Sequence, residues 1–251
     1  MTVATDPREI LDLADWRRRV ASLYAEVRRL SATDVPAALE LWRSTRETLF
    51  REHPSSPIPL ERRAGFRATH YEHDPELRFE VEVVGDVPPP STAPPPVATS
   101  TSFGGIVRPI VFDAEPPRAI QLPVSAGGSM SFTRIGHVEI PFAAGPRRLG
   151  VFWMAGYAGG LFVPFRDATN GSETYAAGRY AIDAAKSADL GGDPAGTTLI
   201  IDFNFAYQPS CAFDPKWACP LAPPENRLDI PIRAGERLGG DASLGGHQAS
   251  T

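Results

Sequence analysis

The residues best suited to chemistry gather in two segments of the 251-residue chain, 161–180 and 202–236. Each segment places carboxylate, amide, arginine and tyrosine side chains beside short apolar runs. A few polar groups converging on an apolar background are typical of a small-molecule pocket. We therefore predict a ligand-binding site made of the following residues: Arg166, Asp167, Arg179, Tyr180, Asp202, Asn204, Tyr207 and Asn226.

An arginine within this set could hold an anionic ligand, because the planar guanidinium matches the oxygens of a carboxylate or phosphate. Arg166 and Arg179 are the two candidates for this role. The alternative is an internal network, in which the arginines pair with Asp167 and Asp183 and tie loops together. The sequence leaves both interpretations open.

Two carboxylates, Asp202 and Glu225, are candidates for acid–base catalysis. Asp202 and Asn204 are two residues apart in an expected strand, which would place them on one face about 7 Å apart. Glu225 could act as a general base if burial beside Asp202 raised its pKa, or it could cap a turn. Glu236 is likewise either a candidate acid or a surface turn residue. The chain carries no GxSxG, HExxH, P-loop or dinucleotide-binding motif, so no reaction is specified and no cofactor is expected.

Cys211 and Cys219 are separated by seven residues, whereas zinc sites usually use closer cysteine pairs with two further ligands. None of the five histidines lies beside them in the sequence. Buried packing or a reversible thiol pair is therefore favoured over a metal site. His70 and His73 could also hold a metal, but a solvated loop is favoured there. No metal site is predicted.

The elements that must position these residues fall into two parts. Apolar residues at spacings of three and four predict a helix over residues 10–30, with Asp6 and Pro7 at its start. A second helix is expected from about 34–36 to 51, where a proline-rich stretch ends helical structure. From residue 77 the apolar period changes to two, which indicates a strand with one buried face.

Further short strands are expected near 97–103, 106–113, 118–124, 129–142, 147–154, 160–166, 174–183, 197–205 and 228–233. The alternation changes phase around Arg134–Gly136, which predicts a β-bulge there. The 26 prolines and 22 glycines exclude a long helical bundle and suit many short strands joined by turns. We predict a mainly β (α+β) fold, an antiparallel β-sandwich or barrel with two N-terminal helices.

The predicted fold divides the chain into three segments. Residues 1–67 form a helical segment that packs on a β-rich domain over 68–238, and 239–251 form a flexible tail. The sequence PPPSTAPPP at 88–96 is expected to be a spacer loop within the β-domain.

Several segments together resemble one family, the bacterial and archaeal group catalogued as domain of unknown function 1684. The most specific are DFN-x-AY-x-P-x-CAF (202–213), CPLAPPENRL (219–228) and I-x-AGE (232–236). The resemblance extends over roughly 10–238. Because the family is uncharacterised, it implies an architecture and a site region but no reaction.

The formal net charge of −5 argues against nucleic acid as the main partner, because phosphate binding needs a positive surface. No stretch approaches the ~20 apolar residues of a membrane span. Acidic residues near the N-terminus break any signal-peptide apolar region, so we expect a cytoplasmic protein. The oligomeric state is left open.

The leading functional hypothesis is a β-domain that binds a small, possibly anionic, molecule and could catalyse a reaction on it. One alternative is a non-catalytic interaction module that uses Trp16, Trp42 and the proline loop as contact elements. A third hypothesis is a thiol or metal site at Cys211 and Cys219.

Overall fold

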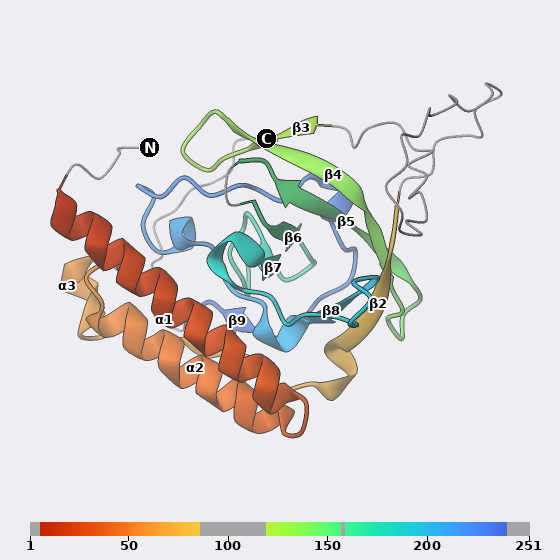
Figure 1. The fold of residues 1–251 in the computed structure, drawn as a ribbon, viewed down its shortest axis with the longest axis horizontal. Coiled ribbons are helices and arrows are strands. Elements are labelled where there is room, and N and C mark those ends of the chain that lie inside the picture. The colour runs from red at the N-terminus through yellow and green to blue at the C-terminus, as the bar shows by residue number, and fades with distance from the viewer. Residues whose placement is uncertain (1–5, 86–118, 157–158, 240–251) are drawn as a thin grey trace, which may run out of the picture.

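The computed structural model describes residues 6–85, 119–156 and 159–239, and it shows a curled antiparallel sheet beside two long helices (Figure 1). The helices are α1 (Pro7–Ser31), α2 (Val35–Glu52) and the one-turn α3 (Leu60–Arg63). The strands are β1 (Thr69–His70), β2 (Arg78–Val84), β3 (Ala119–Pro123), β4 (Ser129–Ile140), β5 (Arg147–Met154), β6 (Leu161–Phe165), β7 (Arg179–Asp183), β8 (Thr198–Asp202) and β9 (Glu236–Arg237). The predicted mainly β, α+β fold class is confirmed, and its barrel form is the better description, because the sheet curls into a half-barrel.

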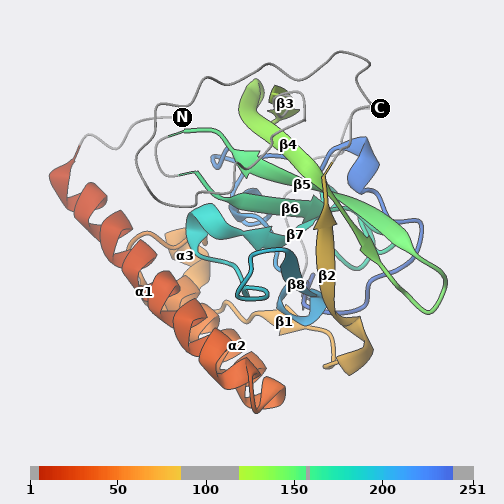
Figure 2. The same cartoon turned by 45° about the vertical axis from the view of Figure 1, so that its right-hand side comes forward.

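The two long helices start where the sequence indicates. The Asp6 carboxylate accepts a hydrogen bond from the Arg8 amide, and the Asp34 carboxylate accepts one from the Ala37 amide. Each aspartate thereby satisfies an amide that has no partner within its helix. The pair lies across one side of the half-barrel (Figures 1 and 2).

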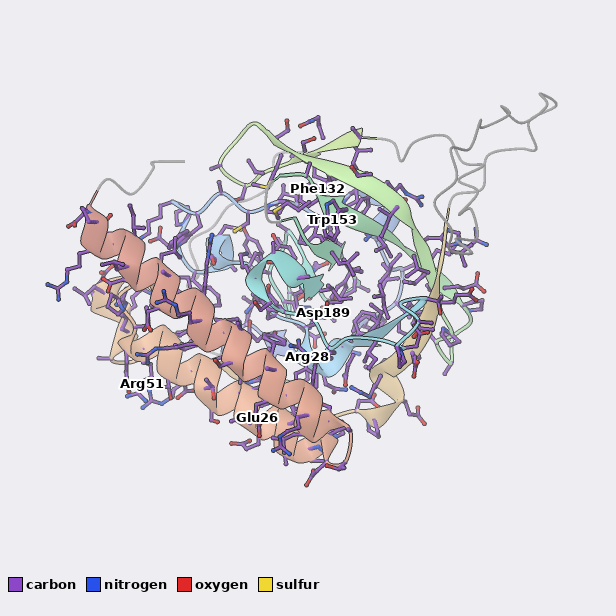
Figure 3. All side chains as sticks on the ribbon, in the orientation of Figure 1. Glu26, Arg28, Arg51, Phe132, Trp153 and Asp189 are labelled. Atoms are coloured by element: carbon purple, nitrogen blue, oxygen red, sulfur yellow. The ribbon has the colours of Figure 1, made fainter. Side chains whose placement is uncertain are left out.

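The helices are fixed to the sheet by apolar packing and by side-chain hydrogen bonds. Trp42 of α2 is fully buried, and its indole donates to the Tyr24 hydroxyl of α1. The expectation that Trp42 serves as an exposed contact element is therefore wrong, because its ring belongs to the core. Arg28 of α1 donates to the carbonyl of Asp189 beyond β7, a contact whose two residues are labelled in Figure 3.

The main sheet has the strand order β7-β6-β5-β4-β2-β8, with β3 pairing with β4 outside this path. The predicted bulge in β4 is confirmed, because the register against β5 shifts between Arg134 and Gly136. Gly136 has a φ of 154°, and a Cβ at this position would collide with the Val84 carbonyl. Only glycine therefore lets the bulge approach β2 so closely.

The wall of the half-barrel is completed after β8. The chain makes a 3₁₀ turn over Phe203–Phe205, and Tyr207 then exchanges two backbone hydrogen bonds with Tyr180 of β7, at 3.0 and 3.1 Å. The predicted strand over 197–205 is wrong beyond Asp202, because the Asp202 carboxylate accepts from the Asn204 amide and caps the turn.

Two other strand predictions also need correction. The strand expected over 174–183 begins only at Arg179, because Thr174 and Gly178 take part in turns that fold back on Thr169 and Tyr175. Residues 228–233 form no strand, because only Leu228 and Ile230 form backbone–backbone hydrogen bonds with segment 166–168, which is too few contacts for a continuous ladder. The strands expected at 97–103 and 106–113, the segment 88–96 and nearly all of the tail 239–251 lie outside the described residues.

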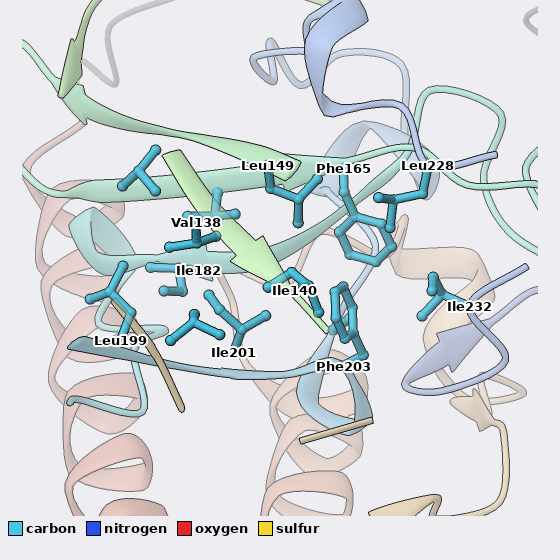
Figure 4. Packing of buried hydrophobic residues seen from close by; sticks show 14 of the residues in the cluster. Val138, Ile140, Leu149, Phe165, Ile182, Leu199, Ile201, Phe203, Leu228 and Ile232 are labelled. Atoms are coloured by element: carbon cyan, nitrogen blue, oxygen red, sulfur yellow. The ribbon is translucent and has the colours of Figure 1, made fainter. Parts of the chain in front are cut away.

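Apolar side chains form two large clusters. One fills the half-barrel, as Figure 4 shows for Val138, Ile140, Leu149 and others. The second lies between the sheet and the helices and includes Trp42 and Tyr180. Phe203 belongs to the first cluster and Phe205 to the second, so the 3₁₀ turn links the two cores.

Candidate functional site

The side chains predicted to form a ligand site are all described, and all of them except that of Arg166 have partners inside the protein. Arg179 is fully buried. Its Nη1 donates to the carbonyls of Ala234 and Glu236, at 2.5 and 3.1 Å, and its Nη2 donates to the Ile232 carbonyl at 2.6 Å. The same Nη2 lies 2.9 Å from Oδ2 of Asp167. Arg179 therefore ties β7 to segment 232–236, as the internal-network interpretation supposed.

The other oxygen of Asp167 organises the turn that follows β6. It accepts hydrogen bonds from the amide and the hydroxyl of Thr169, at 2.7 and 2.5 Å. Both oxygens of this buried carboxylate are thus occupied. The Arg179–Asp167 pair joins two strand ends and the C-terminal segment.

Asp202 and Asn204 lie side by side, in contact through the 3₁₀ turn and not across alternate strand positions. Oδ1 of Asp202 accepts from Nδ2 of Asn204 at 2.9 Å, and Oδ2 accepts from Arg78 at 3.0 Å. Asn204 in turn bonds both the amide and the carbonyl of Asp74. Both side chains are buried, and together they fasten the end of β8 to the start of β2.

Asn226 bridges β5 and β6. Its Oδ1 accepts from the Gly150 amide at 2.7 Å, and its Nδ2 donates to the carbonyls of Gly150 and Pro164, at 3.0 and 2.7 Å. The carboxamide thus supplies hydrogen bonds that link β5 and β6 beyond the point where their backbone pairing ends. Its neighbour Glu225 is 40% exposed and pairs with Arg134 at 2.9 Å, whereas Asp202 pairs with Arg78.

The phenols of Tyr180 and Tyr207 are buried at the edge of the helix-facing core. Tyr180 donates to the Pro220 carbonyl at 2.6 Å, and Tyr207 donates to Oδ2 of Asp183 at 3.0 Å. Burial raises the pKa of both phenols well above the usual value, so they act as hydrogen-bond donors at neutral pH. Lys186 binds the same Asp183 oxygen at 2.9 Å.

Arg166 is the one arginine of the predicted set that keeps an unused guanidinium. Its backbone forms a parallel bridge with Arg227, through its amide to the Asn226 carbonyl and its carbonyl to the Leu228 amide. Its Nε is buried without a hydrogen-bond partner. Within the described part of the chain, neither Arg166 nor Arg227 forms an ion pair or donates a side-chain hydrogen bond.

Arg227 was missed by the sequence reasoning, although it follows Asn226 in the CPLAPPENRL motif. The sequence also did not point to Lys186 and Tyr175. Only the structure shows that these two residues lie near the cysteines. Glu236 is not a surface residue: it is 2% exposed, its Oε1 pairs with Arg46, and its Oε2 accepts from the Gln208 amide.

The two cysteines are free thiols in a buried loop that packs on the β3–β4 turn. The Cys211 amide donates to Sγ of Cys219 at 3.3 Å, and the Cys219 amide donates to Oγ of Ser125 at 3.0 Å. The two cysteines, which are eight positions apart in the sequence, are therefore in contact in the structure.

Among the described residues, no group of three or more His, Cys, Asp and Glu side chains is arranged to hold a metal ion. Burial lowers the pKa of His70 to about 4, so its imidazole is neutral at pH 7. No helix in the described ranges is both long and apolar enough to cross a membrane.

Comparison with known proteins relates this chain to a family of unknown function. Residues 106–237 match the family described as "Protein of unknown function (DUF1684)". The solution NMR structure of an uncharacterized protein from Haloarcula marismortui is similar, with 29% sequence identity and a TM-score of 0.53. That similarity covers 82% of this chain and 96% of the archaeal one. No curated protein matches the chain.

Proposed function

The chain belongs to the DUF1684 family of proteins of unknown function, and on that premise we propose that it is a cytoplasmic β-domain that binds a small anionic molecule. The proposed anchor is the pair Arg166 and Arg227. The observation that carries the proposal is that these neighbouring arginines, within the described residues, have no internal partner for their charges.

An anion between these guanidiniums would remedy an energetic defect. A buried donor without an acceptor costs about 1–3 kcal/mol, and the Arg166 Nε is such a donor. A carboxylate or phosphate oxygen would accept from it and would be attracted by both positive charges. The Nε of Arg179 is also buried without a partner, but the Nη1 and Nη2 of Arg179 already make four hydrogen bonds inside the protein.

The surrounding buried network supports the proposed anchor by fixing the backbone at both arginines. Asn226 precedes Arg227 and is held by three hydrogen bonds to β5 and β6. Asp167 follows Arg166 and is held by Arg179 and Thr169. A site carried by such rigid neighbours loses little conformational entropy when a ligand binds.

A reaction on the bound molecule would require a carboxylate within reach, and Glu225 suits this role better than Asp202. Glu225 lies two residues before Arg227 and is partly exposed, although Arg134 now pairs with it. Asp202 is buried, and both of its oxygens accept hydrogen bonds. Catalysis remains secondary to binding in this proposal.

The test is calorimetric titration of the full chain with inorganic phosphate and, separately, with malonate. We expect binding that weakens at high salt and falls at least about tenfold, or 1.4 kcal/mol, in Arg166→Gln and Arg227→Gln. Arg18→Gln is the matched control, because Arg18 is exposed on α1. Equal affinity in all four proteins, or no heat with either anion, would overturn the proposal.

A further inference from the structure

The cysteine pair lies outside the proposed anion site and forms a second group of reactive side chains. Cys211 is 7% and Cys219 3% exposed, and both are free thiols. They belong to one loop, since Cys211 lies in a 3₁₀ turn over Ser210–Ala212 and Cys219 lies eight positions after Cys211. The 3.3 Å hydrogen bond from the Cys211 amide to Sγ of Cys219 places the two residues in direct contact.

The protein holds Cys219 in a fixed position. Its amide donates to Oγ of Ser125 at 3.0 Å, and its carbonyl accepts from the Ser125 amide at 2.9 Å. The next residue, Pro220, accepts from the buried Tyr180 hydroxyl. A disulfide requires close, correctly oriented Cβ atoms, and this anchored loop already brings the pair within contact distance.

The two thiols have unequal chemistry. The hydrogen bond from the Cys219 thiol lowers the pKa of Cys211 to about 6, and burial opposes this effect without cancelling it. The same hydrogen bond raises the pKa of Cys219. The two pKa values therefore shift in opposite directions, so Cys211 ionises more readily than Cys219, an asymmetry that thiol redox chemistry uses.

Three further groups surround the sulfurs. The neighbouring Ser125 and Tyr175 side chains also lower the pKa of Cys211, and the Ser125 hydroxyl itself donates to the Trp217 carbonyl at 2.8 Å. Lys186, one of only two lysines in the chain, interacts electrostatically with both cysteines. Lys186 is itself held by Asp183, at 2.9 Å, so its positive charge has a defined place near the pair.

We propose that Cys211 and Cys219 form a redox-active dithiol that reduces a small hydroperoxide, with Cys211 as the nucleophile and Cys219 as the resolving thiol. The contact between the Cys211 amide and the Cys219 sulfur, in an anchored and asymmetric loop, carries the proposal. The low exposure of both residues selects the oxidant, because a peroxide the size of a few water molecules can reach them more easily than a protein disulfide can.

The reaction proceeds in two balanced steps. The Cys211 thiolate attacks one peroxide oxygen, the O–O bond breaks, and the leaving alkoxide or hydroxide takes a proton from solvent. The Cys219 sulfur then attacks the resulting sulfenic acid, the S–O bond breaks, and water leaves with the Cys219 proton. Two electrons pass from the thiols to the peroxide, and a dithiol reductant restores the starting state by thiol–disulfide exchange.

The test treats the full, reduced chain with hydrogen peroxide and then maps its peptides by mass spectrometry. We expect an intramolecular Cys211–Cys219 disulfide, seen as the loss of two hydrogen atoms and reversed by dithiothreitol. Cys219→Ser should accumulate a sulfenic acid at Cys211 that dimedone traps, whereas Cys211→Ser should give none at Cys219. Because the chain has only two cysteines, each product is assigned without ambiguity.

A measurement on the unaltered protein keeps the proposal testable if a variant does not fold. The rate of Cys211 alkylation by iodoacetamide should rise around pH 6 and level off by about pH 7, well below the range of an ordinary thiol near 8.5. A rise only above pH 8, trapping at Cys219 in place of Cys211, or thiols that survive peroxide unchanged would overturn the proposal.

Discussion

Arg46 of α2 and Glu236 of β9 form a buried ion pair in which one carboxylate oxygen accepts from both Nε and Nη2, at 3.0 and 2.7 Å. The guanidinium also lies against three aromatic rings, with its carbon 4.6 Å from the Tyr207 centroid, 4.8 Å from Phe50 and 5.0 Å from Trp42. The pair therefore connects the N-terminal helices to the last described strand, 190 residues later in the chain.

Removing one partner of this pair should destabilise the whole fold. In Glu236→Ala the Arg46 charge stays buried without its carboxylate, and we expect a loss of about 3–5 kcal/mol in the free energy of unfolding. Urea unfolding followed by circular dichroism measures this loss. Glu26→Ala is the control, because its ion pair with Arg29 is exposed on α1 and should contribute little. A similar small loss in both variants would contradict the structural role of Glu236.

Asn226→Ala should loosen the contact between β5 and β6. The substitution leaves the amide and carbonyl of Gly150 and the carbonyl of Pro164 without their partner, which should cost about 2–4 kcal/mol. Hydrogen exchange of the Gly150 amide should accelerate more than exchange in β8. Asn226→Asp keeps the acceptor but sets an oxygen against two carbonyls, so it should also destabilise. Unchanged exchange at Gly150 would show that the bridge is not needed.

The neutral, half-buried His70 should make the protein sensitive to acid. Its folded pKa of about 4 lies below the unfolded value near 6.5, because burial disfavours the charged imidazole. The unfolded chain therefore binds the proton first as pH falls, and stability decreases between about pH 6.5 and 4. Between pH 7 and pH 4.5, the free energy of unfolding should fall by roughly 2 kcal/mol less in His70→Gln than in the unaltered chain. Parallel pH curves for the two proteins in urea would refute this assignment.

Much of the fold could be predicted because the signals are local. Asp6 and Asp34 stand next to apolar helical stripes, and the phase change at Gly136 marks the bulge within a single strand. The end of β8 was mispredicted because the Asp202 side chain competes with the strand for the Asn204 amide. Alternation of apolar residues does not reveal such a side-chain cap.

The sequence could name candidate residues for the site, but it could not predict how they are arranged. The backbone carbonyls that accept from Arg179 lie 53, 55 and 57 residues away, in or just after a segment whose apolar pattern predicted a strand and gave no sign of this contact. The sequence therefore pointed to these polar residues as candidates, but it did not show that they divide into separate networks or whether they face a ligand. Arg227 was missed for the same reason, because its link to Arg166 is a bridge between distant segments.

Gly136→Ala should disturb the junction of β2 and β4. A methyl group there would collide with the Val84 carbonyl, and the φ of 154° disfavours any side chain. We expect a loss of about 1–3 kcal/mol in thermal or urea unfolding. Gly65→Ala is the matched control, because an added Cβ meets open space there. If both variants melt alike, the bulge tolerates a side chain and the close approach is not essential.

Lys186 should tune the reactivity of the cysteine pair through its charge. Its ammonium favours the thiolate form of a nearby cysteine. Burial lowers the pKa of Lys186, but the Asp183 carboxylate and the two cysteines together raise it further than burial lowers it. In Lys186→Gln the pH at which Cys211 alkylation rises should therefore move upward from about 6. Lys216→Gln is the matched control, because the other lysine is 62% exposed and pairs with Asp214. A purely structural lysine would change the unfolding midpoint but leave the alkylation profile in place, so the profile decides between the two roles.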